Sequence, residues 1–244
     1  MIQRMLASAL IAGFAAGLLA ALLHFAFIQE LILLGEDYET GALVHFAGAG
    51  DAAPAADHSH ADGTAAHSHG HGDSHGDGDS GLTRNVLTVL FTGLLYVANG
   101  LMLVAGFAMA ERFGHRIGAQ EGILWGIAGF AALQLAPAMG LPPELPGTVA
   151  ADLSERQIWW LGTVLATGTG LALIAYGRGL VFVVLGGVLI AVPHIIGAPH
   201  LEEFYGVAPP EVSAAFAARA LGVGLAAWVA LGWIAAKLWN NATE

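Results

Sequence analysis

The sequence predicts an all-α integral membrane protein, a bundle of five to six transmembrane helices with one long histidine-rich loop. Of its 244 residues, 56% are hydrophobic and only 11% are charged, whereas about 25% of residues are charged in a typical soluble domain. Several apolar runs approach or exceed the roughly 20 residues that cross a hydrocarbon core. Between them lies a polar stretch, residues 58–75, that holds six histidines and no apolar side chain larger than alanine. These three observations predict the fold class.

The first four expected spans are the longest apolar runs of the chain. They are residues 1–28, 86–110, 121–138 and 158–176. Arg4 followed by an apolar run is also how a secretory signal peptide begins. However, the run continues well past the 7–15 apolar residues typical of such peptides, so we expect it to be retained as a membrane anchor.

Two further spans are expected in the second half of the chain. Residues 180–196 form a shorter apolar run, separated from its predecessor only by Gly177, Arg178 and Gly179. This run either forms a tight helical hairpin with its predecessor or is re-entrant, and we assign it as a fifth span. The sixth span, residues 213–239, ends in Lys237 and Trp239, residue types that lie where a helix leaves the bilayer.

The remaining parts of the chain are assigned to loops and tails. Residues 29–85 are expected to form an external, acidic, histidine-rich loop that is largely disordered, and residues 240–244 a cytoplasmic tail. Two small-residue motifs, Gly13-x-x-x-Gly17 and Gly122-x-x-x-Gly126, predict places where helices approach closely.

The basic residues predict the orientation, because cytoplasmic loops carry an excess of lysine and arginine. With six spans and the amino terminus inside, five basic residues fall on the cytoplasmic side and two in external loops. The five are Arg4, Arg112, Arg116, Arg178 and Lys237, and the two are Arg84 and Arg156. We therefore expect a multi-pass protein of the bacterial cytoplasmic membrane with both termini in the cytoplasm.

The histidine-rich stretch has the composition of a metal-binding loop. Its candidate ligands are His58, His60, His67, His69, His71 and His75. In an extended segment, histidines two residues apart point the same way, so one H-x-H pair can hold one divalent ion. Neutral imidazole suits Co²⁺ and Ni²⁺, whereas Ca²⁺ prefers oxygen ligands. The alternative is a solvated acidic linker that binds metal only incidentally.

Two further histidines lie within expected spans. His194 follows Pro193, which lacks an N–H and therefore frees the carbonyl of Leu189. A ring nitrogen and a carbonyl oxygen would then face a cation near the outer membrane surface. The alternative for His194 is a hydrogen bond to a neighbouring helix, and for His24, alone in an apolar helix, it is a packed core histidine.

Three segments carry a resemblance to a known family. They are LAPAMGLPPELPG at 135–147, RQIWWLGT at 156–163 and PHIIGAP at 193–199, and IQELILLGEDYETG at 28–41 fits as well. With them, nearly the whole chain resembles the CbtA family of predicted cobalt transporter subunits. The resemblance implies about five spans, cobalt import, and a separate one-span companion subunit rich in histidine. It also implies a set of candidate metal-contacting residues: Glu30, Glu39, Glu144, His194 and His200. The long histidine loop is an elaboration of this member.

These observations favour uptake of a divalent transition metal, Co²⁺ or Ni²⁺, with the external loop as a metal collector. One alternative is a protein for efflux of nickel, cobalt or zinc with inverted topology. The other is a membrane protein without transport activity that binds or senses metal or acts as an enzyme. Lys237 is the only lysine, so the chain has no Walker A motif, and neither a nucleophile motif nor HExxH is present. We expect no enzymatic activity, no prosthetic group and no nucleic-acid partner. The lipid bilayer, the metal ion and a second copy of the chain are the other partners considered.

Overall fold

The computed structural model describes residues 2–45, 77–203 and 205–243, and the six histidines of residues 58–75 lie outside these ranges. Helices dominate the described residues. In chain order they are α1 Ile2–Phe27, α2 Gln29–Glu39, α3 Asp77–Arg112, α4 Ala119–Phe130, the π-helix η2 Ala131–Leu135, α5 Ala136–Ala138, α6 Leu153–Tyr176, α7 Leu180–Ile196 and α8 Pro210–Thr243. The all-α fold class is thereby confirmed.

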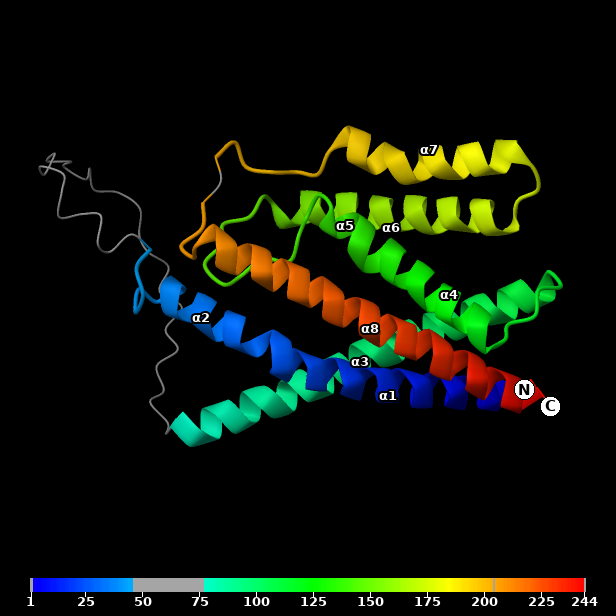
Figure 1. Ribbon diagram of the computed structural model, residues 1–244, viewed down its shortest axis with the longest axis horizontal. Coiled ribbons are helices and arrows are strands. Elements are labelled where there is room, and N and C mark those ends of the chain that lie inside the picture. Colours follow the sequence, from blue (N-terminus) through cyan, green and yellow to red (C-terminus); the bar gives the residue numbers. More distant parts are fainter. Residues whose placement is uncertain (1, 46–76, 204, 244) are drawn as a thin grey trace, which may run out of the picture.

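The long helices run back and forth between two ends of the molecule (Figure 1). Both chain termini and the α3–α4 and α6–α7 connections lie at one end, called here the terminal end. Helix α2 and the α5–α6 and α7–α8 connections lie at the opposite end, called here the loop end. This arrangement is the one that six consecutive crossings produce.

Four described helices are long and apolar enough to cross a membrane. They are Met5–Phe27, Gly81–Arg112, Leu153–Tyr176 and Pro210–Asn241, and α7 is a shorter apolar helix of 17 residues. The expected span at 121–138 is a continuous helical segment made of α4, η2 and α5. The helices therefore agree with the expected count of five to six.

A π-helical turn interrupts the segment at 121–138, and Pro137 gives a local chemical reason for it. Pro137 has no N–H, so the carbonyl of Leu133 cannot receive the usual bond from four residues ahead. The helix widens over η2, and the N–H of Ala136 donates to the carbonyl of Ala131, five residues back. Insertions of this kind are frequent at functional sites.

Glycines bring α1, α3, α4 and α8 into close contact. A methyl group at Gly13 would lie 2.5 Å from the Cα of Val97, and one at Gly126 would overlap the carbonyl oxygen of Trp228. Gly17 and Gly122 make equally close contacts, with Gly93 and with Gly232. The contacts predicted for both small-residue motifs are thus confirmed.

Helices α6 and α7 form the hairpin expected from the Gly177–Gly179 turn. Gly179 has a φ of 92°, which favours glycine. A methyl group at Gly170 would lie 2.6 Å from the carbonyl oxygen of Gly186, so the two backbones nearly touch. Among the described helices, α7 packs against α6 alone, and α6 joins the other helices through α4, η2 and α5.

The ends of the expected loop at 29–85 are helical, which corrects the boundaries predicted from sequence. Residues 29–39 form α2, because Gly35 allows the helix to lie against Leu145 and Pro146. Helix α3 begins at Asp77, well before its apolar run. Arg84 on this polar extension pairs with Glu36 of α2 at 3.2 Å, which links the two helices.

Candidate functional site

The segments 135–147, 156–163 and 193–199 meet at the loop end, around the first turns of α6. A methyl group at Gly140 would lie 2.6 Å from the Trp159 ring and 2.7 Å from the Cβ of Ala198, so one residue from each segment meets here. We call this place the motif junction. It comprises Gly140, Glu144, Arg156, Trp159, Pro193, His194 and Ala198.

An ion pair joins the first two segments of the motif junction. A guanidinium Nη2 of Arg156 donates to a carboxylate oxygen of Glu144 at 2.8 Å. The two side chains are 25% and 31% exposed, so water screens the pair only partly. Glu144 is one of the expected metal-contacting residues, and its carboxylate is already paired with the guanidinium of Arg156.

Trp159 fixes the end of α7. Its indole N–H donates to the carbonyl oxygen of Pro193 at 3.2 Å, and the N–H of Gly197 donates to the same oxygen at 3.0 Å. The Trp159 ring meets the half-buried His194 ring edge-on, with centroids 6.1 Å apart. Among the described residues, the nitrogens of His194 have no hydrogen-bond partner. Its ring is therefore held by aromatic packing rather than by the interhelical hydrogen bond considered above.

The Leu-Pro-Pro-Glu-Leu-Pro-Gly segment also forms a small apolar core at the loop end. Leu145 is 3% exposed and packs with Ile28 and Phe216, which brings α1, α2 and α8 together. Farther along, the N–H of Val149 donates to the carbonyl of Tyr205 at 3.3 Å. The α5–α6 connection is thus tied both to the start of α8 and to the α7–α8 connection.

Asp152 starts α6, the helix that carries Arg156 and Trp159. Its carboxylate accepts hydrogen bonds from the hydroxyl and N–H of Ser154 and from the N–H of Glu155. The Ser154 hydroxyl, with those two N–H groups, holds the pKa of Asp152 below its usual range. An ionised N-cap at this position fixes where α6 begins.

The other expected ligands lie on separate elements at the loop end. His24 is half-buried in the last turn of α1, Glu30 is exposed in the first turn of α2, and His200 is exposed in the α7–α8 connection. Glu39 ends α2, where a methyl group at Gly147 would lie 3.2 Å from its Cβ. Across residues 2–45, 77–203 and 205–243, no three His, Asp or Glu side chains come together as a metal site.

Sequence reasoning did not find Arg156 and Trp159 as organising residues. Arg156 was counted only as an external basic residue, although opposite charges at 144 and 156 flank a Pro-Gly turn that can bring them together. Trp159 has a role that depends on the end of α7, 34 residues away, and no local signal predicts that contact.

The chain was compared with models of known protein families, with curated proteins and with solved structures. The family model described as "Probable cobalt transporter subunit (CbtA)" matches residues 2–240, a range that includes all three segments of the motif junction. No curated protein and no solved structure matches the chain.

Proposed function

The chain belongs to the CbtA family of probable cobalt transporter subunits, and on that premise we propose that it takes up Co²⁺ across the bacterial cytoplasmic membrane. The observation that carries the proposal is the convergence of the three family-like segments at one end of a membrane-spanning helical protein. Such a convergence is expected when the segments build one site. Ni²⁺ is the second candidate cargo, because imidazole binds both ions.

We propose that the terminal end faces the cytoplasm. Arg112, Arg116 and Arg178 lie in or beside the connections at that end, and Lys237 lies in the last turns of α8. An excess of basic residues on one side of a membrane protein favours the cytoplasm for that side. The loop end, with the motif junction, then faces outward.

The histidine-rich loop connects α2 to α3, and in this orientation the helix ends that it connects lie at the outer side. We propose that His58, His60, His67, His69, His71 and His75 collect scarce metal there and raise its local concentration. A collector of this kind need not lie on the transport route. Its histidines are therefore expected to matter at low metal concentration and not at saturation.

His194 is the residue proposed to meet the ion at the entrance of the route. The Trp159 ring orients it, and Pro193 leaves the carbonyl of Leu189 without its usual donor one turn earlier. A neutral imidazole and a carbonyl oxygen could replace water on an incoming Co²⁺. Other residues proposed to line the approach are His24, Glu30, Glu39, Glu144 and His200.

The carboxylate of Glu144 lies 2.8 Å from the guanidinium of Arg156. Glu144 can therefore bind the ion only if its carboxylate contacts both cations or breaks its ion pair with Arg156. A dication approaching Glu144 also meets the repulsion of the guanidinium. We infer that Glu144 binds metal transiently, with Arg156 recovering the carboxylate after the ion has moved on.

The chain has no nucleotide-binding motif of its own, so the proposed transport is secondary or depends on other components. The description of the family as a subunit supports a partner, for which a small one-span histidine-rich protein is proposed. No catalytic reaction forms part of the proposal.

Two measurements test the proposal. Cells expressing the chain, alone and with the companion, are expected to accumulate more radiolabelled Co²⁺ than cells carrying the empty vector. A cysteine at Ser68 should react with an impermeant reagent from outside, which distinguishes uptake from the inverted, effluxing topology. Unchanged accumulation in both strains would refute transport, and labelling of Ser68→Cys only after lysis would refute the orientation.

A further inference from the structure

A cavity of about 620 Å³ lies between α3, α4 and α6 at the terminal end, away from the motif junction. Helices α4 and α6 meet at η2 and α5 and diverge toward the terminal end (Figure 1), and the cavity occupies the space between them. Its volume is in the range of small-molecule sites, about 300–1,000 Å³. The proposed transport route does not use it.

The walls of the cavity are apolar and open toward the membrane. Leu103, Leu133, Leu171 and Trp228 line it, and Leu124, another lining residue, is 65% exposed. A helix that spans a bilayer presents such an exposed leucine to lipid tails. The cavity is therefore accessible sideways from the hydrocarbon.

The depth of the cavity corresponds to one leaflet. On α6 its lining extends from Tyr176, the last residue of the helix, to Gly168. Eight residues at 1.5 Å each give about 12 Å. Half of a hydrocarbon core is roughly 15 Å. With Tyr176 placed at the membrane surface, the cavity would reach to near the bilayer centre, as a single acyl chain does.

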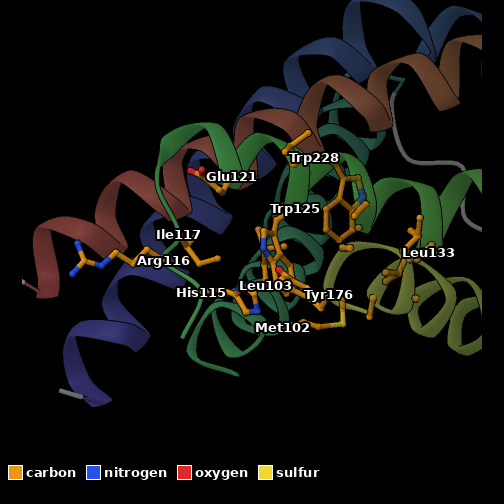
Figure 2. A pocket seen from close by; sticks show the side chains of 18 of the residues that line it. Met102, Leu103, His115, Arg116, Ile117, Glu121, Trp125, Leu133, Tyr176 and Trp228 are labelled. Carbon is orange, nitrogen blue, oxygen red and sulfur yellow. The ribbon is translucent and has the colours of Figure 1, made fainter. Parts of the chain in front are cut away.

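Arg116 places a cation at the mouth of the cavity. Figure 2 shows His115 beside Tyr176 and Met102, with Arg116 extending outward from the same connection. Among the described residues, Arg116 pairs with no carboxylate. Among the described residues, Glu121 is the one carboxylate that lines the cavity, and it accepts the N–H of Gly118 at 3.0 Å and caps α4.

Other charges at this end add to the positive field. Arg112 and Arg178 are exposed and, within the described parts of the chain, pair with no acid. The carboxylate of Glu111 accepts the indole N–H of Trp239 at 2.6 Å. Both of these acids keep their negative charge, but each holds a donor of the protein itself, and Arg112, Arg116 and Arg178 outnumber them.

We propose that this cavity binds one anionic phospholipid. One acyl chain lies against Leu133, Leu171 and Trp228, and the headgroup phosphate meets Arg116 and His115. Basic pockets between transmembrane helices on the cytoplasmic side bind anionic headgroups in this way. The lipid would fill the space that separates the α6–α7 hairpin from the rest of the bundle.

Glycines on α6 offer a plug and a matched control. A methyl group at Gly168 or at Gly162 would meet nothing within 4 Å, but only Gly168 lines the cavity. Gly168→Leu therefore starts from a Cβ in open space on the cavity wall and adds bulk there, and Gly162→Leu adds the same bulk elsewhere on the helix. Arg116→Gln removes charge at the mouth, and Arg112→Gln removes it outside the lining.

Native mass spectrometry of the delipidated full chain, titrated with phosphatidylglycerol or phosphatidylcholine, tests the proposal. We expect one retained phosphatidylglycerol and weaker retention of phosphatidylcholine. Gly168→Leu should abolish that retention while Gly162→Leu keeps it. Arg116→Gln should weaken binding about fivefold, the value of one basic residue near an anionic surface, and Arg112→Gln should weaken it less.

Two results would overturn the proposal. One is equal retention of the two lipids by the unmodified chain, which would show a site without charge selectivity. The other is retention by Gly168→Leu as strong as by Gly162→Leu, with circular dichroism showing both variants folded. Metal accumulation is measured in the same variants, so that loss of lipid binding is distinguished from loss of the proposed transport.

Discussion

The ion pair between Glu144 and Arg156 offers a quantitative test of the motif junction. The perturbation is a double-mutant cycle made of Glu144→Gln, Arg156→Gln and the double variant. Each single change leaves one partner of a pair 2.8 Å apart without its counter-charge. If the pair ties the α5–α6 connection to α6, the two changes should not be additive.

The magnitude follows from the exposure of the pair. Solvent-exposed pairs contribute about 0–1 kcal/mol, whereas breaking a fully buried pair costs about 3–5 kcal/mol. With side chains 25% and 31% exposed, Arg156 and Glu144 lie between these limits. Because solvent screening weakens a partly exposed pair, we expect a coupling energy of about 1 kcal/mol.

The chain contains a matched control for this cycle. Arg84 and Glu36 also form a pair at the loop end, at 3.2 Å, but their side chains are 46% and 42% exposed. Equilibrium unfolding of the purified protein in mixed micelles with increasing SDS gives the free energies for both cycles. Added salt should reduce the coupling of Arg84 and Glu36 more than that of Arg156 and Glu144.

The reasoning would be refuted by a coupling between Glu144 and Arg156 no larger than that between Glu36 and Arg84. A null coupling with normal folding would mean that the junction is held by Gly140 and Trp159 alone. Cobalt accumulation by the double variant then reports separately on Glu144 as a ligand.

Four other outcomes are expected. Gly126→Val should lower the free energy of unfolding by about 1–3 kcal/mol through overpacking against α8, while Gly162→Val, in open space, should be nearly neutral in the same SDS titration. Alanine at the six histidines of 58–75 should lower Co²⁺ accumulation at scarce metal and spare the maximal rate, whereas His194→Ala should lower the rate at saturation, both read from dose-response curves corrected for protein amount. A peptide of residues 51–80 should release Co²⁺ in calorimetric titrations as pH falls through about 6.5, because only neutral imidazole is a ligand. Asp152→Asn should destabilise the protein at neutral pH, and this loss of stability should shrink in acid. The pKa of Asp152 is lowered in the folded protein. Its stabilisation is therefore present above the unfolded-state pKa of about 3.9 and is lost as pH falls through the folded-state pKa.

The membrane spans were predictable because the hydropathy of a run depends only on its own consecutive residues. A run such as 158–176 must form its hydrogen bonds internally in lipid, so composition alone implies a helix. The small-residue motifs were predictable for a related reason, since Gly122 and Gly126 recur on one face and invite a backbone to approach. Their partner helix, α8, could not be read from the motif itself.

The ends of the loop were not predictable from hydropathy. Helix α2 is a short helix whose apolar side is covered by Leu145, more than a hundred residues later in the chain. The polar beginning of α3 likewise receives support from outside, through Glu36 and through Gln29, whose amide donates to Asn85 at 3.2 Å. Tertiary contacts, not local propensity, decide such boundaries.

The candidate site was predicted as a set of residues but not as a geometry. His194 was found because a histidine beside a proline in an apolar run is unusual. Its contact with Trp159, and that of Glu144 with Arg156, depend on how α6 meets two connections. The cavity at the terminal end could not be predicted from the sequence, because it arises from the divergence of α4 and α6.

Cobalt movement into sealed vesicles tests the central claim most directly. The purified chain is reconstituted with a cobalt-quenched dye trapped inside, and external Co²⁺ supplies an inward gradient as the driving force. We expect the dye to be quenched faster than in protein-free vesicles, and His194→Ala to slow the quenching at saturating Co²⁺. Quenching no faster than in protein-free vesicles, both for the chain alone and with its companion, would contradict the account.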